Sequence, residues 1–300
     1  RRFAAGSSLW LTRFVSAVPD FTYPIFAILV SCLVCLVLIA PELLKLTFRL
    51  DRSLIRRLLV YSLPLMVAGL PGIMNDVLDR VLMRFINADP VNWRADLGVY
   101  QAAVKLAVIM NLFIQMFRYA AEPFFFQRQK EKGSKELYAK VMNYFVAFCM
   151  FAFLFVMLYI DEIGLLLGKD FRPGLSIAPV MLMAYLVLGM LFNVNMWYKL
   201  SGKTGYAIWV TLAGLAVTIL VNALFMPKYS YHAAAWGHLA SYTAMLIIST
   251  LLGNKYYRIP YKWGVTALLI LFGLGVWGIS LLLPEMGLWP KLAVHTLLIV

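Results

Sequence analysis

The stretch LLVYSLPLMVAGLPGIMNDVLDR at residues 58–80 decides the fold class. Most of it is apolar, and its length matches the roughly 20 residues that an α-helix needs to cross a bilayer. Pro64 and Pro71 each remove a backbone hydrogen bond and so kink a helix. Small and polar residues recur in it at spacings of three and four, which places them on one stripe: Gly69, Gly72, Asp76, Asp79, Arg80 and Met83. We therefore predict a kinked transmembrane helix over residues 59–86 whose polar stripe faces protein or water.

The whole chain shares this apolar character. Of its 300 residues 63% are hydrophobic and 14% charged, whereas soluble domains are typically about 45–50% apolar and about 25% charged. This composition argues against a water-soluble enzyme. Leu, Met and Ala dominate the apolar runs, which lack the alternation of a membrane barrel. We predict an all-α polytopic membrane helix bundle with eight complete crossings, at residues 21–43, 59–86, 97–119, 141–160, 177–198, 206–226, 233–252 and 264–283, and a ninth beginning near Leu288.

The net charge of +13 is distributed unevenly over the loops. Alternate loops, near residues 44–58, 127–140, 199–203 and 255–262, hold most of the loop Lys and Arg. Short cytoplasmic loops are enriched in these residues, so we predict that these four loops face the cytoplasm and contact anionic membrane lipids. Residues 1–20, expected as a loop outside the membrane, carry three Arg and disagree with this rule. Because membrane insertion already requires the asymmetry, we do not expect nucleic-acid binding.

Motifs for catalysis or metal binding are absent from the sequence. It contains no HExxH, paired CxxC or GxSxG, and its three Cys lie in apolar runs, where they pack. Gly202-Lys203-Thr204 resembles the end of a P-loop, but position 197 is Trp where the first glycine would stand. His232, His238 and His295 lie near helix ends, where an interfacial or packing role is expected rather than metal binding. We therefore expect no metal and no cofactor.

Ionisable residues inside the spans are costly and face a cavity or a partner. The rise of a helix places Asp76 and Lys105, on neighbouring antiparallel spans, at the same depth. We hypothesise that Asp76 or Asp79 pairs with Lys105, which leaves Arg80 and Arg84 on the outer side of a cationic cavity. The alternative is that Asp76 and Arg80 neutralise each other and Arg84 reaches the outer surface. Arg118 and Glu122, also four residues apart, are predicted to form a structural ion pair.

Four stretches carry a resemblance to bacterial polysaccharide flippases of the Wzx type, in the superfamily that also holds MATE drug exporters and lipid II flippases. They are YSLPL at 61–65 running into Asp79-Arg80, LGVYQAAVKL at 97–106, FRYAAEPFFF at 117–126, and KLSGKT at 199–204 followed by Asn222, Pro227, Tyr229 and Ala235-Trp236.

The resemblance implies two bundles of six helices with two extra helices at the end. Residues 1–20 would be a loop before a span, and residues 21–43 the last helix of the first bundle. Residues 59–252 would form the whole second bundle, and residues 264–300 would begin the extra pair. The first five helices of the first bundle would then be missing, and with them half of any central cavity.

It also implies transport without chemistry. An undecaprenyl-diphosphate-linked oligosaccharide would be flipped across a bacterial inner membrane by alternating access, for surface polysaccharide or lipopolysaccharide synthesis. Partners would include polysaccharide polymerase and export machinery. The cations Arg80, Arg84 and Lys105 would bind the diphosphate. Asp76 and Asp79 would bind H⁺ or Na⁺. Three aromatics would either stack on sugars or simply pack: Tyr100, Tyr119 and Trp197.

Three other functions stay open at the level of sequence. A MATE-type exporter of organic cations would need a more acidic cavity. A membrane glycosyltransferase or ligase would need catalytic groups on a large outer loop, and the predicted outer loops are short. A scaffold without a substrate would not need a charged, kinked helix pair.

Overall fold

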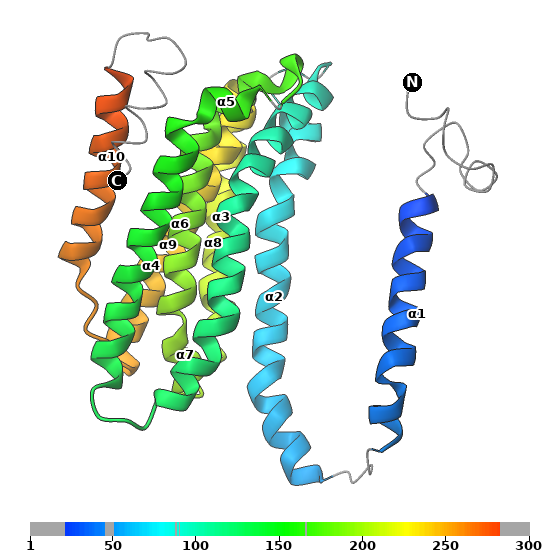
Figure 1. The fold of residues 1–300 in the computed structure, drawn as a ribbon, viewed down its shortest axis with the longest axis vertical. Helices are drawn as coiled ribbons and strands as arrows, with labels where there is room; N and C mark the ends of the chain where they lie inside the picture. Colours follow the sequence, from blue (N-terminus) through cyan, green and yellow to red (C-terminus); the bar gives the residue numbers. More distant parts are fainter. Residues whose placement is uncertain (1–21, 46–50, 88, 90, 166, 283–300) are drawn as a thin grey trace. The chain divides into compact units, whose positions relative to one another are not determined.

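The computed structural model describes residues 22–45, 51–87, 89, 91–165 and 167–282 (Figure 1). Within these ranges the secondary structure is helical, without a strand, and eight helices are long and apolar enough to cross a membrane. The predicted fold class, an all-α polytopic membrane helix bundle, is confirmed. Residues 1–20 and the ninth span expected near Leu288, with His295, lie outside the described residues.

The chain divides into two units, Arg1–Ile55 and Arg56–Val300, which are described separately. In the first unit the main element is α1 (Thr22–Leu44), which matches the span predicted at 21–43. Its described apolar side chains are exposed on all sides of the helix, from Ile25 to Ile39. Such a helix needs lipid or further protein around it.

The second unit contains the remaining helices. They are α2 (Arg52–Ile86, which begins in the first unit), α3 (Trp93–Arg128), α4 (Ser134–Leu158), α5 (Ile160–Gly164), the 3₁₀ helix η2 (Lys169–Ile177), α6 (Ala178–Val194), α7 (Met196–Leu200), α8 (Tyr206–Tyr229), α9 (Tyr231–Tyr256) and α10 (Trp263–Leu281). Several extend past the predicted spans, α3 by nine residues at its end. The span expected at 177–198 is broken at Asn195, whose side-chain oxygen accepts a hydrogen bond from Ser249.

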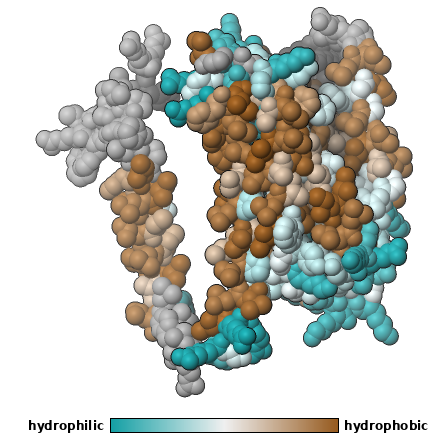
Figure 2. All heavy atoms as spheres, turned by 180° about the vertical axis from the view of Figure 1, so that it is seen from behind, coloured by the Kyte–Doolittle hydropathy of each residue, from teal (hydrophilic) through white to brown (hydrophobic). Residues whose placement is uncertain are grey.

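The packing of the second unit centres on α9, which lies against α8 and α6, while α6 also contacts α3 and α4, and α4 contacts α10. The connections after α3, α7 and α9, which carry the basic residues, all lie at the lower end of this unit in Figure 1. Figure 2 shows hydrophobic residues over the middle of the bundle and hydrophilic residues towards its ends. This distribution is expected of a protein that crosses a bilayer.

One close approach of backbones joins η2 to α3. A Cβ placed on Gly174 would lie 2.6 Å from the carbonyl oxygen of Val99, which belongs to the backbone of α3 and cannot rotate away. We expect Gly174→Ala to lower the free energy of unfolding by about 1–3 kcal/mol, because overpacking forces the two elements apart. Thermal unfolding of the purified protein measures this effect. Gly275→Ala on α10, where a Cβ meets nothing within 4 Å, is the control and should be neutral or slightly stabilising. Equal loss in both variants would contradict the close packing.

Helix α2 differs from its neighbours because most of its apolar surface is exposed. One narrow stripe is buried, and it consists of Ala68, Pro71, Asn75, Asp79 and Met83. The predicted stripe therefore holds for Asp79 and Met83, whereas Gly69 and Arg80 are exposed. The side chain of Asp76 lies outside the described residues. Ala68 and Met83 join the hydrophobic core, and the buried polar contacts of α2 come from Asn75 and Asp79.

Candidate functional site

A cavity of about 780 Å³ lies within the second unit. Its walls come from α2, α3, α6, α7, α8 and α9. Amides, hydroxyls and charged groups interrupt an otherwise apolar lining, and they are Asn75, Arg80, Tyr100, Asn111, Gln115, Arg118, Tyr119, Glu122, Tyr185, Asn193, Asn195, Tyr198, Lys199, Thr211, His238 and Tyr242. A ligand pocket typically combines an apolar wall with a few such polar groups, and this cavity has that composition.

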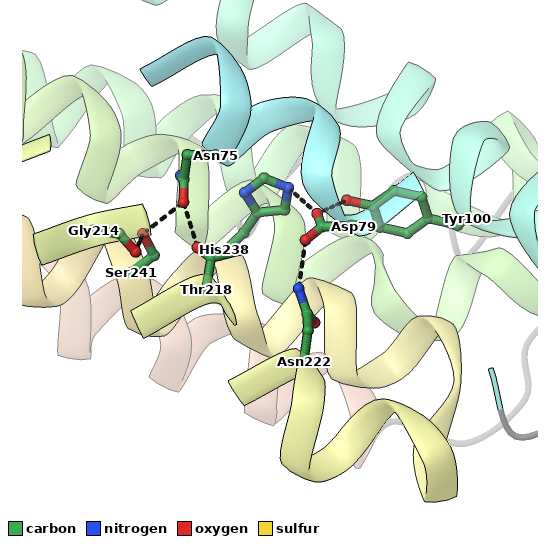
Figure 3. A network of polar contacts seen from close by, with 8 residues as sticks. All are labelled: Asn75, Asp79, Tyr100, Gly214, Thr218, Asn222, His238 and Ser241. Carbon is green, nitrogen blue, oxygen red and sulfur yellow. Dashed lines mark hydrogen bonds and ion pairs between the residues drawn. The ribbon is translucent and has the colours of Figure 1, made fainter. Parts of the chain in front are cut away.

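The most buried charged group of the unit is Asp79, and it lies beside this cavity. Its Oδ2 accepts a hydrogen bond from Tyr100 Oη at 2.9 Å and lies 2.6 Å from His238 Nε2, within ion-pair distance, and its Oδ1 accepts a hydrogen bond from Asn222 Nδ2 at 2.7 Å. Figure 3 shows these three side chains converging on the carboxylate from α3, α9 and α8. A carboxylate is tolerated in an apolar interior only when such donors replace water.

A second cluster lies one helical turn away on α2. Asn75 Oδ1 accepts hydrogen bonds from Thr218 Oγ1 and from Ser241 Oγ, and the Ser241 hydroxyl is also within reach of the carbonyl oxygen of Gly214 (Figure 3). A hydroxyl has one proton, so Ser241 shares it between two acceptors. Asn75 and Asp79 together connect α2 to α3, α8 and α9 through buried polar contacts.

This geometry corrects the hypothesis that Asp79 pairs with Lys105. The partners of Asp79 are Tyr100, Asn222 and His238, and Lys105 is exposed. The physical reason is helical phase: Ala103 and Ala107 form the buried face of α3, and Lys105, two residues from each, points the other way. The alternatives that involve Asp76 rest on a side chain outside the described residues.

Of the three cations predicted to form the cavity, the structure places only Arg80 in its lining. Arg84 is exposed, with its guanidinium carbon 5.6 Å from the ring centre of Phe85, and it does not line the cavity. Lys105 does not line it either. Two cations that were not assigned to the cavity, Arg118 and Lys199, do.

The predicted ion pair of Arg118 with Glu122 is wrong. Glu122 Oε1 on α3 instead accepts a hydrogen bond from Lys199 Nζ on α7, at 2.6 Å. The guanidinium of Arg118 lies over the ring of Phe192, 4.9 Å from its centre. Partners on other helices therefore replace the i,i+4 pair: Glu122 is neutralised by Lys199, and the guanidinium of Arg118 is held by an aromatic face.

The three aromatics considered for sugar stacking occupy different places. Tyr100 is buried and lines the cavity, where its hydroxyl is engaged by Asp79. Tyr119 also lines the cavity and is 71% exposed. Trp197 is 1% exposed, does not line this cavity, and donates its Nε1 hydrogen to Ser249 Oγ at 3.1 Å. For Trp197 the packing alternative is the one that the structure supports.

Sequence reasoning did not assign several residues to the site, among them Asn75, Arg118, Lys199, Asn222 and His238. Asn75 and Asp79 are four residues apart on one helix, which is a signal for a shared face. His238 was assigned to packing by its place near a helix start, although a histidine inside a span is itself a sign of function. Nothing local marks Lys199, since its partner lies 77 residues away.

No group of three or more His, Cys, Asp or Glu side chains that could hold a metal ion occurs among the described residues. Comparison with protein-family models, with curated proteins and with solved structures finds no match to the chain. The candidate site therefore rests on its own geometry.

Proposed function

We propose that the chain belongs to a transporter that moves a lipid-linked oligosaccharide diphosphate across a membrane by alternating access, the function that the resemblance implies. One observation carries this proposal, the polar cavity of about 780 Å³ inside a membrane helix bundle. A path for a sugar needs amide and hydroxyl groups within the bilayer, where polar groups are otherwise avoided. The same resemblance is the basis on which we place the transporter in a bacterial inner membrane.

The charge of the lining favours an anionic ligand over the organic cation of a drug exporter. Among the described lining residues three are basic, Arg80, Arg118 and Lys199, and Glu122 is the one carboxylate. The carboxylate is already engaged by Lys199. Cations in a site shielded from bulk water attract phosphate oxygens strongly.

Asp79 and His238 are the proposed groups for coupling transport to an ion gradient. The carboxylate of Asp79 is contacted by the three side chains named above, and the imidazole of His238 occupies the position next to Oδ2 that a bound cation would need. This arrangement favours H⁺ over Na⁺. Protonation of Asp79 would weaken its attraction to His238 and the polar contacts that hold α2 to α8 and α9. The movement of the two bundles in alternating access would therefore depend on protonation.

Complementation of a flippase-deficient bacterium by the gene for this chain tests the proposed function. Surface polysaccharide should return, and the lipid-linked precursor should become accessible from outside the cell. Precursor that remains on the cytoplasmic face despite membrane expression would contradict the proposal. If expression instead creates a new glycosidic linkage in the lipid-linked sugar, and polysaccharide returns only because of that linkage, a membrane glycosyltransferase would be favoured.

The same assay tests the role of Arg80. We expect Arg80→Gln to lower the rate of precursor flipping at least about tenfold, since a hydrogen bond to a charged ligand contributes on the order of 1.5–3 kcal/mol. Arg94→Gln, which removes the same charge from an exposed position on α3 outside the cavity, is the matched control. Flipping at the unaltered rate in both variants would remove Arg80 from the transport path.

A further inference from the structure

Three charged side chains meet at one end of the cavity. Arg118 and Glu122 come from the last third of α3, and Lys199 comes from α7. The Nζ of Lys199 lies 2.6 Å from Glu122 Oε1, and the two side chains are 20% and 36% exposed. All three line the cavity, so a ligand inside it can reach each of them.

This cluster is separate from Arg80. The connection between α2 and α3 joins the end of α2 to the start of α3, whereas the cluster lies near the other end of α3. Arg80 is six residues from that end on α2, whereas Arg118 is 25 residues from it on α3. At a rise of about 1.5 Å per residue the backbone positions of the two arginines lie on the order of 30 Å apart along the bundle. One phosphate group cannot contact both.

Arg118 has no carboxylate within ion-pair distance among the described residues. Its guanidinium carbon lies 4.9 Å from the ring centre of Phe192 and 5.4 Å from that of Tyr119. Aromatic faces hold a guanidinium while leaving its N–H donors available at the edges. The rigid fork of these donors matches the oxygens of a phosphate.

A second observation points to a ligand at this end. Asn193, next to Phe192 on α6, is 3% exposed and lines the cavity, and its Oδ1 has no hydrogen-bond partner, although its Nδ2 donates to the carbonyl of Gly189 at 3.3 Å. Asn111 Oδ1, about two turns along α3 from Arg118, is likewise buried without a partner. A buried acceptor without a donor is unfavourable. Hydroxyl groups of a bound sugar would supply the missing donors.

We infer that Arg118 and Lys199 bind the phosphate or diphosphate of a sugar-bearing ester, and that Glu122 is an internal counterion which this ligand displaces from Lys199. The inference rests on the proposed function and names the part of the substrate that this end of the cavity holds. In the empty cavity Glu122 neutralises Lys199, and the ligand must break this charge-assisted bond before it can gain one of its own. Removal of the Glu122 charge should therefore strengthen binding, whereas removal of either cation should weaken it.

Binding to the purified chain in lipid nanodiscs tests the inference, with inorganic pyrophosphate and farnesyl diphosphate as probes in calorimetric titration. We expect Arg118→Gln and Lys199→Gln each to raise Kd at least about tenfold, and Glu122→Gln to lower it several-fold. Lys140→Gln, which removes a charge from an exposed position on α4, is the control and should leave Kd unchanged. Thermal unfolding of each variant verifies that it is folded.

The outcomes separate the parts of the inference. If Glu122→Gln weakens binding as much as Arg118→Gln does, then Glu122 is not a displaceable counterion. If Arg118→Gln and Lys199→Gln bind like the unaltered chain, the phosphate site is wrong. Tighter binding of farnesyl diphosphate than of pyrophosphate supports a lipid-linked ligand, and equal affinity overturns that source. Because binding is measured without transport, failed complementation with intact binding would contradict the proposed function alone.

Discussion

Replacement of Asp79 by alanine is expected to lower the free energy of unfolding by about 3–5 kcal/mol and to abolish flipping, because it removes the acceptor of three buried donors at once. Tyr100, Asn222 and His238 would each lose their contact with the carboxylate, and none of these three residues is more than 5% exposed. The same change also removes one of the two polar residues on the buried stripe of α2 and leaves only the contacts of Asn75. Thermal unfolding and the complementation assay measure the two effects.

Asp79→Asn distinguishes the structural role of this residue from its proposed role in coupling. The amide keeps the shape and one acceptor oxygen, so we expect a smaller loss of about 1–3 kcal/mol in the free energy of unfolding. The proposed flipping should still stop, because the carboxylate that is proposed to bind the proton is gone. Asp170→Ala, an exposed carboxylate on η2, is the control and should stay within about 0.5 kcal/mol. Flipping by Asp79→Asn at the unaltered rate would refute coupling through this residue. Unaltered thermal unfolding of Asp79→Ala would refute the role of its polar contacts in holding α2 to the bundle.

Replacement of Trp197 by alanine is expected to cost about 3–5 kcal/mol, as for other large aromatic side chains removed from a core. The indole is 1% exposed, its ring stacks on Tyr256 with centres 5.9 Å apart, and its N–H is bonded to Ser249. A sugar-stacking role would give a different result, a weaker substrate affinity with little change in thermal unfolding.

Two further variants serve as comparisons for Trp197→Ala. Trp197→Phe keeps an aromatic ring and loses the N–H donor, so its loss should be smaller, about 1–2 kcal/mol. Trp209→Ala on α8 removes an indole that is 69% exposed and should change stability by no more than about 0.5 kcal/mol. If Trp197→Ala unfolds at the same temperature as Trp209→Ala, the packing assignment is wrong.

The polar side chains show where sequence reasoning stops. Asp79 could be assigned to a buried position, because its spacing from Met83 defines a stripe on one helix. Its partners could not be assigned, since Asn222 lies 143 residues away along the chain. The depth argument that favoured Lys105 placed two residues at one level of the membrane, but level does not determine the direction in which a side chain points. The ion pair of Glu122 failed for the same reason, because a lysine 77 residues away lies closer than the arginine on its own helix.

The sequence by itself determined that the chain is a helical membrane protein and where its spans lie. These properties depend on the length of local apolar runs, which a bilayer converts directly into helices, because every backbone polar group must be satisfied within its own segment. Tertiary structure alone decided which charged residues meet. One residue along a helix turns a side chain by about 100°, so that Asp79 enters the core and Arg80 the cavity, and only the packing of α3, α6, α7, α8 and α9 around them determines the partners that each one finds.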